Sequence, residues 1–170
     1  MDVSQPAARS RAEVPEDGRD LEGTFAHAHP IEIRFSDTDA MGHVNNARYL
    51  TYCEIARVAY YERVAGEPLP LATHGAEEGM ILAQISIAYR SPAFFGETLL
   101  VETRVERVGR TSFGMTHRLT APASRYGAAR LVAVADSVLV TYDYGEDHPI
   151  PVPDRLIQGI EALEGRRLRD

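Results

Sequence analysis

Residues 34–57 read RFSDTDAMGHVNNARYLTYCEIAR, and they hold the densest group of polar side chains in the chain. The first half is rich in turn-forming residues, whereas the second half repeats apolar residues at spacings of three and four. We therefore predict a helix from about Ala47 to about Val64, capped by Asn45 or Asn46 and ended by Gly66 and Pro68. Catalytic groups often lie in loops at such junctions.

The segments on both sides of this helix alternate apolar and polar residues, which is typical of half-buried strands. The expected strands cover 31–36, 81–90, 99–106, 112–119 and 129–142, with a loop over 73–79 and a turn at 108–110. The last strand is apolar on both faces, which favours a central position or contact with a partner subunit. A short helix over 154–163, capped by Asp154, is expected near the end of the chain.

The order of these elements is one strand, one long helix and then a series of strands with short connections. Short connections favour an antiparallel sheet, so the fold class is predicted to be α+β. One helix can cover only one face of such a sheet, which leaves the other face and the edges open. We therefore expect at least a homodimer, and a homotetramer fits the same pattern.

Composition excludes several classes of protein. The chain has 170 residues, 18 basic and 25 acidic side chains and a pI near 5.4, which argues against a nucleic-acid partner. It contains no Lys, which excludes Schiff-base chemistry and a phosphate-binding-loop lysine, and its single Cys53 excludes an intramolecular disulfide. No apolar run is long enough for a membrane span or a signal-peptide core, so we expect a cytoplasmic protein.

The run from Asp37 to Tyr49, Asp-x-Asp-x-x-Gly-His-Val-Asn-Asn-x-x-Tyr, resembles the 4-hydroxybenzoyl-CoA thioesterase-like branch of the hot-dog-fold family. The resemblance covers about 30–154 and includes the strand pattern after the helix. It implies a sheet wrapped around one long central helix, and an enzyme that hydrolyses an acyl-CoA thioester to a free acid and CoA. It also implies that the active site lies at a subunit interface.

The resemblance implies roles for individual residues of this motif. In the family, a carboxylate just before the long helix attacks the thioester or activates water, and Asp39 matches that position. The family's oxyanion contact is a backbone amide at the helix start, which matches Asn46. Asp37, His43 and Asn45 are possible supporting residues, although His43 is more simply a turn residue and Asn45 a helix cap.

Other polar residues are better explained by packing. His117 alternates with core residues and is expected to be an interior histidine, and Cys53 lies on the apolar helix face. Asp136 lies within an apolar strand, either at a solvated edge or along an intersubunit cleft. The histidines lack a ligand spacing, so we expect no metal site and no cofactor. For CoA phosphates the candidate cations are arginines in or beside the strands: Arg90, Arg107, Arg110 and Arg118.

Two alternatives to acyl-CoA hydrolysis remain open at this point. Acyl-ACP thioesterases share a similar motif before the helix, so the carrier could be acyl carrier protein. A non-catalytic acyl-ligand-binding hot-dog protein could keep the same fold. A hydratase of this fold is disfavoured because the chain lacks an Asp-x-Asn-Pro-φ-His signature.

Residues 1–25 are rich in charge, Ala, Pro and Ser and are predicted to be a disordered N-terminal tail, followed by a hot-dog thioesterase domain over 26–165. Such a segment buries too little apolar area to offset the entropy lost on ordering. Deleting residues 2–22 should therefore leave the melting temperature, the oligomer mass and the turnover nearly unchanged. Calorimetry and light scattering check this, and a large drop in melting temperature would show that the tail packs on the domain.

Overall fold

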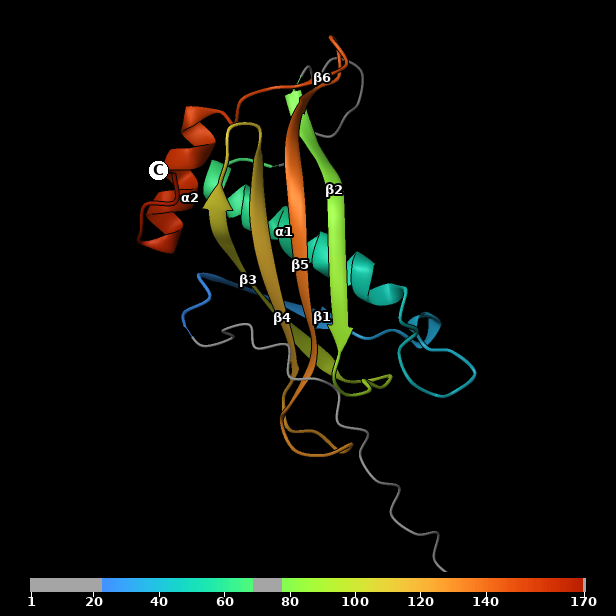
Figure 1. Ribbon diagram of the computed structural model, residues 1–170. Helices are drawn as coiled ribbons and strands as arrows, with labels where there is room; N and C mark the ends of the chain where they lie inside the picture. The colour runs from blue at the N-terminus through green and yellow to red at the C-terminus, as the bar shows by residue number, and fades with distance from the viewer. Residues whose placement is uncertain (1–22, 69–77, 170) are drawn as a thin grey trace, which may run out of the picture.

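One antiparallel sheet and two helices make up the part of the chain that the structure, a computed structural model, describes: residues 23–68 and 78–169 (Figure 1). The strands follow the order β1-β3-β4-β5-β2 across the sheet, and β6 extends it by pairing with β5. The elements are β1 His27–Glu32, a 3-10 helix η1 Phe35–Asp37, α1 Arg48–Ala65, β2 Glu78–Tyr89, β3 Thr98–Val108, β4 Ser112–Ala121, β5 Arg130–Asp143, β6 His148–Pro149 and α2 Asp154–Glu164.

Helix α1 forms where its apolar spacing predicts it. Its buried side chains recur at spacings of three and four and form one stripe: Tyr49, Tyr52, Cys53, Ala56 and Tyr60. The helix ends at Gly66, which adopts a left-handed conformation with φ of +72° and donates its N–H to the Glu62 carbonyl at 2.9 Å. A side chain at this φ would be strained, which explains the glycine.

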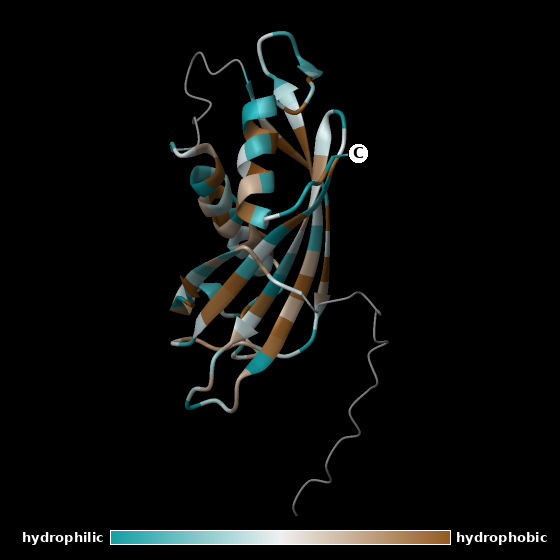
Figure 2. Cartoon of the chain, turned by 90° about the vertical axis from the view of Figure 1, so that its left-hand side faces the viewer, coloured by the Kyte–Doolittle hydropathy of each residue, from teal (hydrophilic) through white to brown (hydrophobic). Residues whose placement is uncertain are grey.

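The sheet lies on one side of α1, which crosses behind the strands in Figure 1. The first half of α1 packs with Ile31, Leu99 and Leu119, and Tyr60 in its second half packs with Met115 and the α2 residue Ile160. Figure 2 shows the alternation of hydrophilic and hydrophobic residues along the strands. The expected α+β hot-dog architecture, a sheet around one long helix, is confirmed.

The last long strand is interior to the sheet, which is one of the two positions that its two-sided apolar pattern favours. β5 pairs with β4 on one side and with β2 on the other. Asp136 lies on the face of β5 away from α1, where its carboxylate accepts a hydrogen bond from the Thr116 hydroxyl at 2.8 Å. A neighbouring strand therefore supplies a partner for this carboxylate, and the residue is not on an edge strand.

Two predicted boundaries are wrong. The first strand spans His27–Glu32 rather than 31–36, because β1 is an edge strand and there tolerates Pro30, which lacks an N–H. After β1 the chain turns into η1, where the Asp37 carboxylate accepts the Arg34 N–H at 3.0 Å and Phe35 is 76% exposed. Asp154 is the first residue of α2 rather than its cap, since the cap position is Pro153.

The structure describes only part of the predicted N-terminal tail and of the predicted loop, and it describes residues beyond the predicted end of the domain. The predicted tail, 1–25, lies outside the described residues except for 23–25, where the Phe25 ring lies 4.7 Å from the Arg104 guanidinium carbon and 4.4 Å from that of Arg118. The expected loop over 73–79 is described only at 78–79, which belong to β2. Beyond 165, Leu168 is buried in the core beside α2.

Among the described helices, none is long and apolar enough to span a membrane.

A buried ion pair fixes the turn between β2 and β3. The Glu97 carboxylate, 1% exposed, accepts hydrogen bonds from two Arg130 nitrogens at 2.6 and 3.0 Å. It also accepts the Ser124 hydroxyl at 2.6 Å and the Phe94 N–H at 2.9 Å. Burial alone would raise the pKa of the Glu97 carboxyl, but these hydrogen bonds outweigh it and hold the pKa below its ordinary value.

Replacing Glu97 by Gln should lower the free energy of unfolding by about 3 kcal/mol, because the Arg130 charge stays buried without its counter-ion. The wild-type carboxyl has a lower pKa folded than unfolded, so its contribution is present at neutral pH and is lost as the pH falls below its ordinary value of 4.5. Urea unfolding between pH 7 and 3 should therefore show a smaller acid-induced loss of stability in Glu97→Gln than in the wild type.

The matched control is Glu78→Gln. Glu78 and Arg155 lie 3.7 Å apart with side chains 54% and 71% exposed, so this pair is solvated. Its loss should change the free energy of unfolding by less than about 1 kcal/mol. Equal effects of the two substitutions would contradict the importance assigned to the buried pair.

Candidate functional site

The segment between η1 and α1 is a closed loop held by its own backbone. The Asp39 N–H donates to the His43 carbonyl at 3.0 Å, and the Asn45 N–H donates to the Asp37 carbonyl at 2.9 Å. Gly42 has φ of +81°, a conformation that suits glycine in this tight turn. The Val44 N–H donates to the Ala93 carbonyl at 2.8 Å, so the turn between β2 and β3 anchors the loop.

Asp39 is held in this loop with its carboxylate partly open to solvent. One carboxylate oxygen, Oδ1, accepts the Met41 N–H at 2.9 Å and lies 3.8 Å from His43 Nδ1. The Asp39 side chain is 27% exposed. The carboxylate is therefore oriented by a backbone hydrogen bond and still accessible to a bound molecule.

The Asn46 N–H, just before α1, is a backbone donor without an acceptor among the residues that the structure describes. Asn45 Oδ1 accepts the Ala47 N–H at 3.0 Å, and the Asn45 carbonyl accepts the Arg48 N–H at 2.9 Å. Within the described residues, the Asn46 N–H donates no hydrogen bond. It lies at the positive end of the helix dipole, where a developing negative charge is stabilised.

Asp39 and Asn46 lie on the same cleft. Its volume is about 370 Å³, and it opens between the start of α1 and the end of β2. It is lined by Asp39, His43, Val44, Asn46, Tyr49, Tyr89, Arg90, Ser91 and Pro92. The Tyr49 and Tyr89 rings meet edge to face with their centroids 5.2 Å apart. Burial and the neighbouring Tyr89 raise the pKa of Tyr49 to about 12, so its phenol stays protonated at neutral pH.

The other predicted supporting residues fall into two groups. His43 lines the cleft beside Asp39, whereas Asp37 is 8% exposed and lies outside the lining. The Asp37 carboxylate instead accepts the Arg34 N–H and lies 3.7 Å from Arg48 Nε. The cap position of α1 is Ala47, so the predicted cap at Asn45 or Asn46 is wrong, but Asn45 Oδ1 accepts the Ala47 N–H and so holds the turn that leads into the helix.

The residues assigned to packing lie in the core, as predicted. His117 is fully buried, with Nδ1 3.0 Å from the Thr103 hydroxyl and Nε2 3.3 Å from the Ser137 hydroxyl. Burial lowers the pKa of His117 to about 3, so the ring is neutral across the physiological range. Cys53 is also fully buried, and burial raises the pKa of its thiol to about 12.

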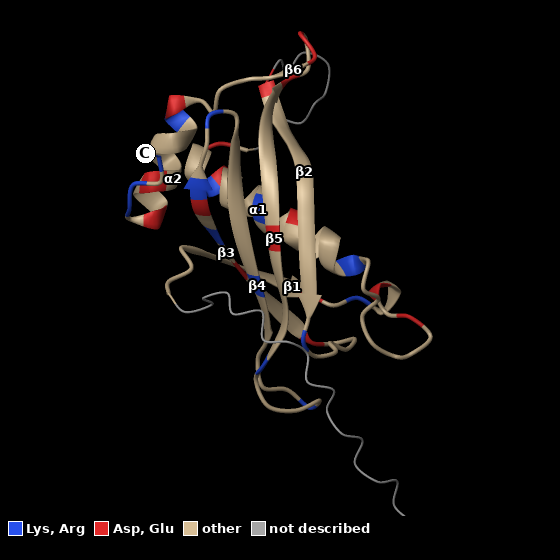
Figure 3. Cartoon of the chain, viewed as in Figure 1, with Lys and Arg blue, Asp and Glu red and all other residues tan. Residues whose placement is uncertain are grey.

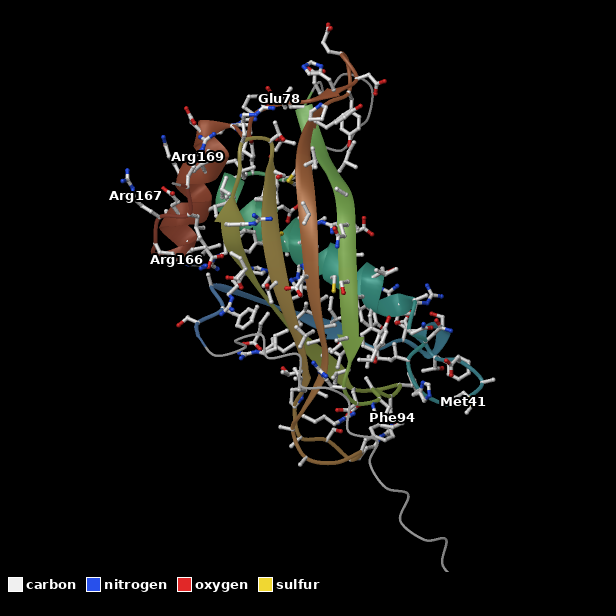
Figure 4. All side chains as sticks on the ribbon, viewed as in Figure 1. Met41, Glu78, Phe94, Arg166, Arg167 and Arg169 are labelled. Atoms are coloured by element: carbon white, nitrogen blue, oxygen red, sulfur yellow. The ribbon has the colours of Figure 1, made fainter. Side chains whose placement is uncertain are left out.

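Of the four candidate arginines for CoA phosphates, Arg90 lines the cleft. Arg118 instead makes two hydrogen bonds to the Glu102 carboxylate, at 2.7 and 2.8 Å, on the sheet face away from α1. Figure 3 shows a further group of charges on and after α2. In Figure 4 the arginines labelled there, Arg166, Arg167 and Arg169, lie on the opposite side of the molecule from Met41 in the loop before α1.

The sequence did not predict that Tyr89, Ser91 and Pro92 form one wall of the cleft. These residues are more than forty positions from Asp39, and no local pattern distinguishes them from ordinary strand-end residues. They reach the site because the end of β2 and the following turn lie against the loop that precedes α1. Among the described residues, no group of three or more metal-ligating side chains lies together.

Comparison with known families and structures matches residues 33–160 to the thioesterase-like superfamily. A thioesterase from Thermus thermophilus, solved with coenzyme A and Zn, is 33% identical and superposes with a TM-score of 0.69. The superposition covers 85% of this chain and 98% of that one. The 1,4-dihydroxy-2-naphthoyl-CoA hydrolase of Synechococcus elongatus is 28% identical over 127 residues, 73% of this chain and 87% of the relative.

Two further curated relatives match a smaller part of their own length. YneP of Bacillus subtilis, a candidate acyl-CoA thioesterase by its name, is 33% identical over 76 residues, 45% of this chain and 54% of the relative. Protein THEM6 of Danio rerio is 31% identical over 97 residues, 57% of this chain and 46% of the relative. The match therefore spans about half the length of these two relatives.

Proposed function

The chain belongs to the thioesterase-like superfamily, and we propose that it hydrolyses an acyl-CoA thioester to a free acid and CoA, with Asp39 as the general base or nucleophile. The observation that carries this proposal is that one cleft holds both a carboxylate and a backbone N–H that has no acceptor in the described part of the chain. Hydrolysis of a thioester needs both groups, because one supplies or activates the attacking oxygen and the other stabilises the oxyanion. The similar 1,4-dihydroxy-2-naphthoyl-CoA hydrolase, and the similar thioesterase solved with coenzyme A, support CoA as the carrier.

The chemistry of the two groups is complementary. As a base, the Asp39 carboxylate takes a proton from water while the water oxygen attacks the thioester carbonyl carbon. As a nucleophile, it attacks that carbon itself, and water then hydrolyses the acyl-enzyme anhydride. On either route the carbonyl oxygen becomes negative next to the Asn46 N–H, and collapse of the intermediate expels the CoA thiolate, which is then protonated.

The first test is Asp39→Asn, assayed with acetyl-, hexanoyl-, palmitoyl- and benzoyl-CoA by following release of the free thiol. Asn keeps the size of the side chain and can still accept the Met41 N–H, but it cannot act as a carboxylate base or nucleophile. We expect kcat to fall by about 10²- to 10⁴-fold in a protein with wild-type melting temperature. Wild-type kcat in this variant would falsify the assignment of Asp39.

Asp37→Asn is the matched control, because Asp37 is the neighbouring carboxylate but lies outside the cleft lining. It should lower stability slightly, since it removes the negative charge that lies 3.7 Å from Arg48 Nε, and should reduce kcat much less than Asp39→Asn does. The same assay with acyl carrier protein thioesters identifies the carrier. If only acyl carrier protein thioesters are hydrolysed, the carrier is acyl carrier protein and not CoA. If neither class of thioester is hydrolysed, the result favours an acyl-ligand-binding protein.

We further propose that the protein works as a homodimer or higher homo-oligomer with the cleft at a subunit interface. β2 is a twelve-residue edge strand, and among the described strands it pairs only with β5, so its other edge is free to pair. Apolar side chains on this strand and on α1 are more than one-third exposed: Leu50, Ile55, Ile81, Leu82 and Tyr89. Tyr89 belongs both to this exposed set and to the cleft lining, so a partner on β2 would border the cleft.

Dissociation should therefore remove the activity. Light scattering and turnover measured over the same dilution series should show specific activity falling as the oligomer mass falls. If a monomer keeps full specific activity, the shared site is excluded while the single-chain assignment of Asp39 stands.

A further inference from the structure

Hydrogen bonds hold the backbone on both sides of the Asn46 N–H. On its N-terminal side, the Asn45 N–H and carbonyl bond to the Asp37 carbonyl and the Arg48 N–H, each at 2.9 Å. On its C-terminal side, the Ala47 N–H bonds to Asn45 Oδ1. These contacts are local, since all partners lie between η1 and the first turn of α1.

The remaining contact comes from a distant strand. The Tyr89 hydroxyl, at the end of β2, donates to the Asn46 carbonyl at 2.9 Å. The Tyr89 ring packs edge to face on Tyr49, in the first turn of α1, and both rings line the cleft. Tyr89 thus ties the edge strand of the sheet to the residue whose N–H has no acceptor within the described residues.

We propose that Tyr89 is a positioning residue for the hydrolysis proposed above: its hydroxyl holds the Asn46 carbonyl and so fixes the adjacent Asn46 N–H as the oxyanion donor. This inference rests on the proposed function, because it assigns how one group of that site is kept in place. An oxyanion donor acts through pre-organisation, so a donor free to reorient loses part of its effect. The Asn46 carbonyl shares one planar peptide group with the Ala47 N–H, so Tyr89 and Asn45 Oδ1 hold that group together, and it meets the peptide group of the Asn46 N–H at the Asn46 α-carbon.

Tyr89 acts through Asn46 and not as an acid or a base. Its single hydroxyl hydrogen is already donated to the Asn46 carbonyl. Burial also raises the pKa of the Tyr89 phenol, so the hydroxyl stays protonated through the neutral range. The variant that removes the hydroxyl should therefore change the rate without changing the shape of the pH profile.

The test is Tyr89→Phe, which removes the hydrogen bond and keeps the ring on Tyr49. With hexanoyl-CoA and benzoyl-CoA as probes, kcat should fall roughly tenfold, less than the 10²- to 10³-fold cost of removing an oxyanion donor outright. KM should change by less than twofold. Inhibition by the matching thioether analogues of the two probes should also be unchanged, because they lack the carbonyl that becomes an oxyanion.

Tyr126→Phe is the matched control. Its hydroxyl donates to the Phe95 carbonyl at 2.9 Å and its side chain is 40% exposed, against 43% for Tyr89, but it lies outside the cleft lining. Tyr126→Phe should keep the wild-type kcat. Both variants should melt within a few degrees of the wild type, because the hydrogen bonds lost are partly exposed: one in Tyr89→Phe and two in Tyr126→Phe, whose hydroxyl also accepts from Arg125 Nη2 at 2.9 Å.

The outcomes separate this proposal from the proposed function. If Asp39→Asn is inactive but Tyr89→Phe keeps the wild-type kcat, the role of Tyr89 is overturned and the thioesterase assignment stands. A raised KM at constant kcat, or an equal loss in Tyr126→Phe, would also overturn it. If the wild type hydrolyses no thioester, the proposed function fails first and the positioning role fails with it.

Discussion

The buried ion pair between Glu97 and Arg130 is the interaction on which the start of α1 depends. It closes the turn between β2 and β3, and the Ala93 carbonyl in that turn accepts the Val44 N–H. The loop that carries Asp39 is thereby fixed to the sheet and not only to its own helix. A buried carboxylate that lost its counter-ion would be costly, so this turn has one strongly favoured arrangement. The position of the carboxylate on the cleft follows from it.

The sheet gives its two faces and two edges different roles. The face toward α1 is mostly apolar, with the Thr103 and Ser137 hydroxyls beside the neutral His117 ring and with His27 packed edge to face on Tyr60. The opposite face carries paired polar groups, such as Glu102 with Arg118 and Thr116 with Asp136. The β2 edge is long and lies beside the cleft, so the surface best suited to a second copy of the chain is next to the residues proposed to react.

The proposed chemistry uses groups that the fold provides without strain. The positive end of α1 favours a developing oxyanion, and the loop places a carboxylate near it. Asn45 accepts the Ala47 and Arg48 N–H groups, whereas the Asn46 N–H has no acceptor within the described residues and borders the cleft. Since the Tyr89 contact comes from the edge strand, the geometry of this donor depends on the packing of the sheet against the helix as well as on the helix itself.

The sequence by itself determined the long helix, the antiparallel strands and the motif that contains Asp39 and Asn46, because periodicity and turn chemistry are local properties. It predicted the helix end at Gly66 correctly, gave a central position as one of two alternatives for β5, and placed His117 and Cys53 in the core. It misplaced β1, since whether an edge strand tolerates Pro30 depends on which strand becomes the edge. Only the tertiary structure decided that Asp39 faces the cleft and Asp37 does not, and that Tyr89 contacts Asn46, because those contacts join residues that no sequence spacing relates.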